Sequence, residues 1–213
     1  LPTPESIASG ARAWNLSEIA SKMISSPNEA AGRVIEAFEK LGVDYLLAGS
    51  FSSNFYGIPR STKDADFVAV LGEDVGPLIG ELSDDFEFDP QPSFEMVTGT
   101  LREKARAKEI PFEIEIFHLS EEAHDQSRFS RRVSVYDELI GREVSLPAPE
   151  DVIITKLRWA EIAKRGKDRD DVRDVIAVQG DDALDWDYIH RWTAEHGTRK
   201  LLDEIRASIP PID

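Results

Sequence analysis

Two aspartates, Asp64 and Asp66, flank Ala65 in the first half of the chain. Residues 65–71 (ADFVAVL) are short and apolar, which predicts a buried strand. Residues i and i+2 of a strand point to the same face, so the two carboxylates can share a divalent cation. Mg²⁺ prefers such hard oxygen ligands, although an isolated Asp-x-Asp is more often part of a solvated turn. The surrounding residues must therefore decide between a metal site and a turn.

A glycine and a serine precede these aspartates. Residues 44–48 (DYLLA) predict a short buried strand, and Gly49 and Ser50 connect it to a short helix predicted over residues 51–56. Glycine lets the backbone approach a phosphate closely, and the serine hydroxyl and amide lie where a helix N-terminus points donors at an anion. Ser50 has the alternative role of capping that helix. Both roles are compatible, so the pair is predicted to position a triphosphate.

A third carboxylate is expected from a neighbouring strand. Residues 111–117 (PFEIEIF) alternate, which places Glu113 and Glu115 on one face of a predicted strand and the apolar residues on the other. A third acid would complete a site for two Mg²⁺ ions, which activates an attacking hydroxyl and neutralises a leaving pyrophosphate. The alternation leaves both glutamates as candidates.

Three further polar residues are candidates for substrate binding. Arg60 and Thr62 lie just before the aspartates and are predicted to contact phosphate or acceptor, although a polar loop of this kind is usually only exposed. Lys156 borders the apolar stripe of a helix predicted over residues 149–164. Its ammonium group either reaches the site or extends into solvent.

Other charged groups have simpler interpretations. Asp168 and Asp171 have the spacing of a helix cap and an acidic first turn. Solvated helix faces are the simplest interpretation of three basic clusters. These clusters are Arg102, Lys104, Arg106 and Lys108; Arg128, Arg131 and Arg132; and Lys164, Arg165 and Lys167.

The central motif resembles a known signature. Gly49-Ser50, thirteen intervening residues and Asp64-Ala65-Asp66 are similar to the signature of the nucleotidyltransferase superfamily that includes DNA polymerase beta. Within it, the chain looks like the bacterial branch of minimal nucleotidyltransferases and AbiEii-type toxin proteins. Three later segments extend the resemblance, which covers roughly residues 29–179. They are residues 113–117 (EIEIF), 149–157 (PEDVIITKL) and 167–172 (KDRDDV).

This resemblance implies an enzyme that transfers NMP from an NTP to a hydroxyl acceptor. It assigns nucleotide binding to Gly49 and Ser50, and catalysis with Mg²⁺ binding to Asp64, Asp66 and Glu115, where Glu115 replaces the family's usual aspartate. The acceptor is an RNA end, a protein or a small molecule. The alternative is a catalytically silent relative that acts as a binding partner, for instance in a toxin–antitoxin pair.

The predicted fold class is α/β (α+β): a mixed sheet flanked by helices, followed by a helical C-terminal part. Residues 1–28 are expected to form a loosely attached leader, residues 29–147 the nucleotidyltransferase core and residues 148–213 a helical subdomain. The other predicted helices cover residues 29–41, 73–82, 169–178, 185–195 and 199–207. The other predicted strands cover residues 94–100, 132–136 and 142–146.

Composition excludes several classes of function. The chain has 213 residues, of which 41% are hydrophobic, enough for a core. Because it contains no cysteine, it has neither disulfides nor thiolate metal sites, which favours a cytoplasmic setting. Its apolar runs are too short to cross a membrane. A net charge of −16 disfavours nonspecific binding to DNA or RNA.

Overall fold

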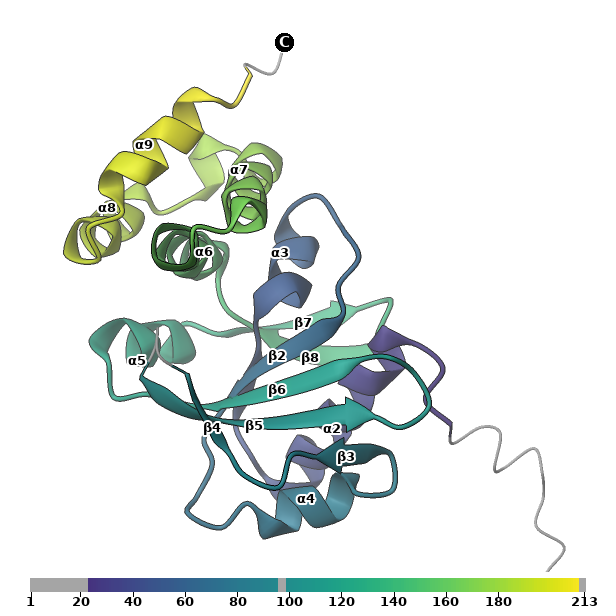
Figure 1. Cartoon of the computed structure of the whole chain (residues 1–213). Coiled ribbons are helices and arrows are strands. Elements are labelled where there is room, and N and C mark those ends of the chain that lie inside the picture. Colours follow the sequence, from purple (N-terminus) through teal and green to yellow (C-terminus); the bar gives the residue numbers. More distant parts are fainter. Residues whose placement is uncertain (1–22, 96–98, 211–213) are drawn as a thin grey trace, which may run out of the picture.

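Figure 1 shows the computed structural model, which describes residues 23–95 and 99–210 of the chain. Most of the predicted leader, residues 1–28, and the centre of the strand predicted over residues 94–100 lie outside the described residues. The end of the leader that is described belongs to the folded part, because Ile24 is buried and the Ser26 side chain caps the helix that follows.

A mixed six-stranded sheet forms the centre of the molecule. Its strand order is β1-β2-β6-β5-β3, with β4 pairing to β5. Strands β2 and β6 run parallel, whereas the other pairs are antiparallel. The strands are β1 (Tyr45–Leu47), β2 (Asp64–Ala69), β3 (Phe86–Phe88), β4 (Ser93–Glu95), β5 (Thr100–Ala107) and β6 (Glu113–His118). The parallel pairing of β2 with β6 brings together the two strands on which acids are predicted.

Strands β3 and β5 and helix α5 (Ala123–Ser130) have no counterpart in the sequence prediction. Arg102, Lys104 and Arg106, predicted on a solvated helix face, lie on β5 and alternate with buried residues. They therefore share one face of the sheet. The apolar signal of a strand is weak here because the buried positions of β5 hold small or polar residues such as Glu103 and Ala105.

Helices α2 (Pro27–Leu41) and α4 (Gly76–Leu82) pack together on the side of the sheet away from the C-terminal helices (Figure 1). Helix α2 buries one apolar stripe and ends at Gly42, whose φ of 67° suits glycine. Helix α4 starts later than predicted because the backbone N–H of Gly76 donates to the Asp74 side chain in a preceding turn. These helices give the sheet one covered face.

The helical C-terminal part lies on the opposite side of the molecule (Figure 1). One continuous set of buried side chains includes Phe67 of the sheet and Ile153 and Leu202 of these helices. The helices are α6 (Pro149–Ala163), α7 (Gly166–Gln179), α8 (Trp186–Glu195) and α9 (Arg199–Ala207), with a short 3₁₀ helix, η1 (Asp181–Ala183). Helix α3 (Gly49–Tyr56) contacts both β2 and these helices, which places the Gly49–Ser50 turn between the two parts.

The predicted strand pair around Gly141 is confirmed as an antiparallel hairpin of β7 (Val133–Asp137) and β8 (Arg142–Leu146). Gly141 has a φ of 78°, which a glycine adopts without strain. The hairpin packs beside β1 through β8 and leads directly into α6. It thereby connects the sheet to the helical part.

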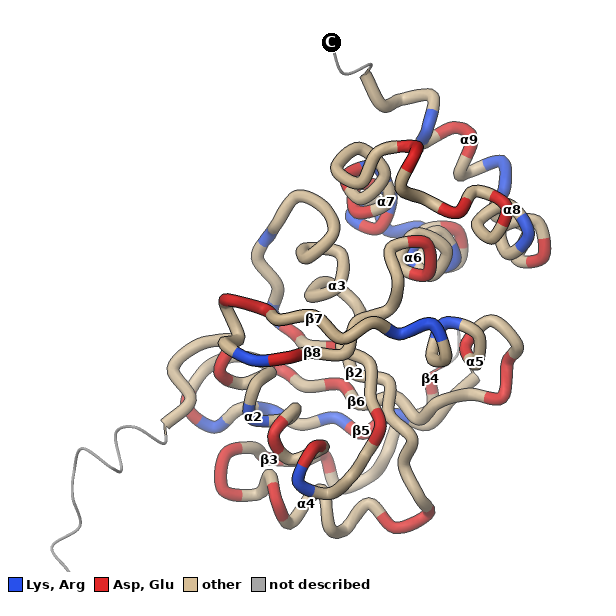
Figure 2. Tube along the Cα trace, turned by 180° about the vertical axis from the view of Figure 1, so that it is seen from behind, with Lys and Arg blue, Asp and Glu red and all other residues tan. Residues whose placement is uncertain are grey.

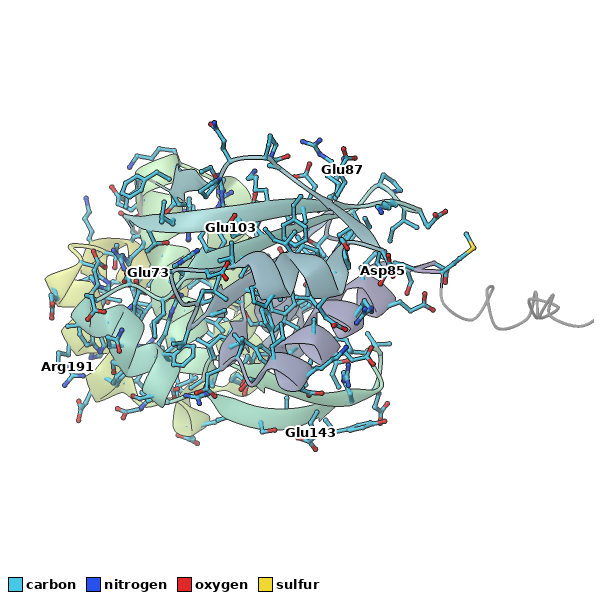
Figure 3. All side chains as sticks on the ribbon, turned by 90° about the horizontal axis from the view of Figure 1, so that it is seen from below. Glu73, Asp85, Glu87, Glu103, Glu143 and Arg191 are labelled. Atoms are coloured by element: carbon cyan, nitrogen blue, oxygen red, sulfur yellow. The ribbon has the colours of Figure 1, made fainter. Side chains whose placement is uncertain are left out.

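Charged residues occur throughout the described part of the chain. Acidic and basic positions are distributed over its coloured trace in Figure 2, and Glu87, Glu143 and Arg191 are exposed at the periphery in Figure 3. Within residues 23–95 and 99–210, no helix has both the length and the apolar character needed to span a membrane.

Candidate active site

The Gly49–Ser50 turn forms the first turn of α3, directly after β1. Gly49 has a φ of +60°, and a Cβ atom built on it would lie 1.8 Å from Oδ2 of Asp66. The backbone N–H of Ala48 also donates to the Asp66 carbonyl oxygen at 2.7 Å. Both the backbone conformation and the close approach of Asp66 therefore require glycine at this position. The turn and the second aspartate form one packed unit.

Asp64 and Asp66 both belong to β2 and point to the same face, because one residue separates them. The Thr62 hydroxyl donates to Oδ1 of Asp64 at 2.7 Å and so orients that carboxylate. The Asp66 carboxylate accepts no hydrogen bond from any residue in the described part of the chain. The two aspartates line one cavity together with Gly49 and Ser50.

Burial, together with the negative charges of Asp64 and Glu115, raises the pKa of Asp66 to about 7, while Lys156 and Lys167 partly oppose the shift. A carboxyl group in this position is stabilised either by a proton or by a nearby cation. The chemistry of Asp64 and Asp66 therefore fits a divalent cation with a preference for oxygen ligands, such as Mg²⁺.

The register of the parallel pair places Glu113 beside Asp64 and Glu115 beside Asp66. Glu115 lines the cavity, whereas Glu113 is more exposed and accepts from Arg106 at 3.4 Å. Both Glu115 oxygens pair with cations of β5, one with Arg102 and the other with Lys104. Among the described residues, no three His, Asp or Glu side chains are arranged to hold a metal ion as they stand. Metal binding by Glu115 stays a prediction.

Arg60 binds an acid of α7 instead of lining the cavity. Its Nε and Nη2 donate to the two oxygens of Asp171 at 2.8 and 2.9 Å, and Nη2 also donates to the Ser50 hydroxyl oxygen at 3.1 Å. Because Ser50 accepts this bond, its own proton is free to be donated elsewhere. Arg60 thus orients Ser50. Neither Arg60 nor Thr62 belongs to the described cavity lining, so direct substrate contacts by these two residues stay predictions.

Lys156 joins the same ionic network from α6. Its ammonium group lies 2.7 Å from Asp171 and 3.3 Å from Asp168, and all three side chains are buried. Burial alone would raise the pKa of Asp171, but hydrogen bonds from Arg60 and the charge of Lys156 lower it to about 2. The interpretation of the two aspartates as cap and first-turn residues is therefore incomplete, because Arg165 occupies the N-cap position and the acids point inward.

The cavity has a volume of about 360 Å³, within the range of small-molecule sites. It lies between the acidic face of the sheet and α6, and α5 lines its far end. Arg128 of α5 is buried, donates to the Thr155 hydroxyl and pairs with Asp125 at 3.4 Å. It therefore does not lie on a solvated face, contrary to the sequence prediction. Arg128 is buried because it lies on the inward face of α5, and the sequence pattern does not predict that helix.

Comparisons with known proteins place this fold. No protein-family model matches the sequence, and no curated protein matches it significantly. The solution structure of the antibiotic-resistance factor ANT(2'')-Ia is similar over 84% of this chain and 96% of its own, with 12% sequence identity and a TM-score of 0.54. A crystal structure of ANT(2'')-Ia in complex with adenylyl-2''-tobramycin matches 83% of this chain and 99% of its own, with 13% identity and a TM-score of 0.53.

A third similar structure is an antigenic nucleotidyltransferase-like protein from Paracoccidioides brasiliensis, with 20% identity, a TM-score of 0.49, and coverage of 88% of this chain and 96% of its own. The two structures with TM-scores above 0.5 establish that the chain has a nucleotidyltransferase fold. The predicted fold class is therefore confirmed. The narrower resemblance to the AbiEii-type branch stays a prediction.

Proposed function

We propose that this protein is a Mg²⁺-dependent nucleotidyltransferase that moves NMP from an NTP to a hydroxyl acceptor. The observation that carries the proposal is the meeting of Asp64 and Asp66 with the Gly49–Ser50 turn in one cavity. The nucleotidyltransferase fold supports it. Two carboxylates without a cationic partner among the described residues, beside a glycine-containing helix N-terminus, suit a metal-bound triphosphate.

Each residue has a defined role in this proposal. The free proton of Ser50 and the first N–H groups of α3 bind triphosphate oxygens, and Lys156 and Lys167 attract the anion from the cavity wall. Asp64 and Asp66 hold Mg²⁺, which neutralises phosphate charge when bound. Arg60, which is itself held by Asp171, keeps the Ser50 side chain in position through a hydrogen bond to its hydroxyl oxygen.

The reaction itself is a phosphoryl-type substitution. The acceptor oxygen forms a bond to the α-phosphorus of the NTP, and the bond from that phosphorus to the bridging oxygen of the pyrophosphate breaks. The pyrophosphate leaves with the bonding electron pair, and the acceptor proton passes to solvent. Positioning of the two substrates and neutralisation of charge provide most of the acceleration in reactions of this kind.

The candidate acceptors are an RNA end, a protein and a small molecule, and the cavity wall carries charges of both signs. Its wall carries the basic side chains Arg102 and Arg128 as well as the acidic side chains Glu95 and Asp125. ANT(2'')-Ia, whose fold this chain shares, has been crystallised with an adenylylated aminoglycoside. All three acceptor classes therefore belong in the test.

The test is transfer of label from each α-labelled NTP, with Mg²⁺, to total RNA, to a candidate partner protein and to tobramycin. Wild-type protein is compared with the Asp64→Ala/Asp66→Ala variant and with Asp182→Ala, which changes an exposed acid outside the site. Label transfer that is lost only in the double variant supports the proposal. Binding of a partner protein that is unchanged in the double variant, with no label transfer, would instead identify a catalytically silent scaffold.

A further inference from the structure

Glu115 is held by two cations of the neighbouring strand β5. Its Oε2 accepts from Nη1 of Arg102 at 2.9 Å, and its Oε1 lies 2.7 Å from Nζ of Lys104. The β5–β6 register places Lys104 directly opposite Glu115. Acidic and basic residues are accordingly neighbours on these two strands, as Figure 2 shows. Both oxygens of this carboxylate are thus already neutralised.

Arg102 is itself fixed in position. Its Nε donates to the Ser93 hydroxyl oxygen at 3.0 Å, and its guanidinium lies 5.6 Å from the centre of the Phe117 ring. Arg102 lines the cavity, and its side chain is 20% exposed, whereas that of Glu115 is 14% exposed. Charge-assisted bonds that are shielded to this extent are stronger than those in open solvent.

The other two acids of the site have different surroundings. Asp64 accepts a neutral hydrogen bond from Thr62, and Asp66 contacts no cation directly within the described part of the chain. A divalent cation on Asp64 and Asp66 therefore displaces no ion pair. An ion coordinated by Glu115 would have to displace Arg102 or Lys104 from a shared carboxylate and lie beside their positive charges.

We propose that Arg102 and Lys104 hold Glu115 as their counter-ion, so that the site takes one divalent cation, on Asp64 and Asp66, and not two. This inference rests on the proposed nucleotidyltransferase function. It differs from the sequence prediction of two Mg²⁺ ions. The positive charge that a second ion would bring to the attacking side of the cavity comes from the Arg102 guanidinium, which is already part of the cavity wall.

The test counts bound ions and does not depend on activity. The full chain is dialysed against Mn²⁺, with and without a saturating non-hydrolysable NTP analogue, and bound Mn²⁺ per chain is measured. Wild type is expected to bind one ion. Arg102→Gln/Lys104→Gln releases Glu115 and is expected to bind two, with at least a tenfold gain in affinity at the second site.

Two single variants give the controls. Arg106→Gln removes another cation on the same face of β5, one that pairs with Glu113 and has a side chain 64% exposed, and should still bind one ion. Glu115→Gln should also retain one ion, because Glu115 is not a ligand in this proposal. Two ions on wild type, one ion on the Arg102/Lys104 double variant, or loss of the ion in Glu115→Gln would each overturn the inference.

Failure of the proposed function gives a different result from failure of this inference. If the function is wrong, the NTP analogue does not bind, and Asp64→Ala/Asp66→Ala leaves the bound Mn²⁺ unchanged. If only this inference is wrong, the analogue binds in a manner that requires both aspartates, and two ions accompany it. Thermal unfolding of each variant shows whether the number of bound Mn²⁺ ions was measured on folded protein.

Discussion

Replacing Asp66 by asparagine is expected to stabilise the metal-free protein, and the gain should grow as the pH rises toward 7. The Asp66 carboxyl group is pressed against Gly49 and lies beside Asp64 and Glu115. Burial, followed by these two charges, raises its pKa from the ordinary value of 3.8 to about 7. Asparagine has nearly the same shape but carries no charge at any of these pH values.

Proton linkage determines the direction in which wild-type stability changes with pH. Between pH 3.8 and about 7 the folded protein keeps the Asp66 proton while the unfolded chain has lost it, so wild-type stability falls as the pH rises. Well above pH 7, Asp66 is ionised in both the folded and the unfolded protein, and it lowers the wild-type stability no further. At about 1.4 kcal/mol per pH unit, the whole interval corresponds to about 4 kcal/mol, an upper value because Asp66 is only partly buried.

The assay is urea unfolding of wild type and Asp66→Asn in EDTA, from about pH 5.5 to about pH 8. This range stays above the isoelectric point of about 4.7. The stability difference between the two proteins should grow by about 2 kcal/mol across the range and level off above pH 7. Taking the difference cancels the titration of groups common to both proteins, such as His196. Asp182→Asn, an exposed acid, should show no such trend.

Mg²⁺ provides an independent check at pH 8. Binding to the folded wild type should raise its stability by about 2.7 kcal/mol at a hundredfold excess over Kd, with little effect on Asp66→Asn. A stability difference that does not change with pH, or an asparagine variant that is less stable than wild type at pH 8, would show that the Asp66 charge does not destabilise the metal-free protein.

Three further predictions concern the residues around the phosphate turn. Gly49→Ala should abolish NTP binding in calorimetry, because the new Cβ would displace Asp66. Gly42 also has a positive φ but has no atom near its Cβ position, so Gly42→Ala should cost only about 1 kcal/mol of stability and leave NTP binding intact. Arg60→Lys keeps the charge but loses the paired hydrogen bonds to Asp171, so that Ser50 is held less firmly. The affinity for NTP should fall about tenfold, which corresponds to about 1.4 kcal/mol of binding free energy. Unchanged affinity would contradict the role of Arg60 in orienting Ser50. Asp171→Asn leaves Arg60 and Lys156 partly unpaired and should cost about 3 kcal/mol at pH 7 in urea unfolding. Because the folded pKa of Asp171 is lowered to about 2, that cost should shrink as the pH falls from 3.8 toward 2, and a constant cost would argue against the ion network as its source.

The elements that carry the central motif were predictable because their patterns are local. The runs around Leu47 and Phe67 are apolar, and Gly49 marks the turn between strand and helix. The alternation around Glu115 likewise identifies β6. Helices of the C-terminal part follow from regular apolar spacing, which needs no knowledge of their neighbours.

The remaining parts of the site depend on contacts between distant segments. The sequence alone does not show that Lys104 pairs with Glu115, because this ion pair depends on the register between β5 and β6. Arg60 and Asp171 are 111 positions apart, and only the packing of α3 against α7 makes them partners. Arg128 has the composition of a surface residue, yet the folded chain buries it against Asp125. Long-range ion pairs of this kind leave no periodic signal.

Anomalous diffraction from crystals grown with Mn²⁺ and a non-hydrolysable NTP analogue would locate the metal ion and the triphosphate in one experiment. If Asp64 and Asp66 hold the ion, an anomalous peak lies about 2.0–2.3 Å from their carboxylate oxygens, with the triphosphate against Ser50. A peak that lacks either aspartate, or a triphosphate bound away from the Gly49–Ser50 turn, would contradict this arrangement.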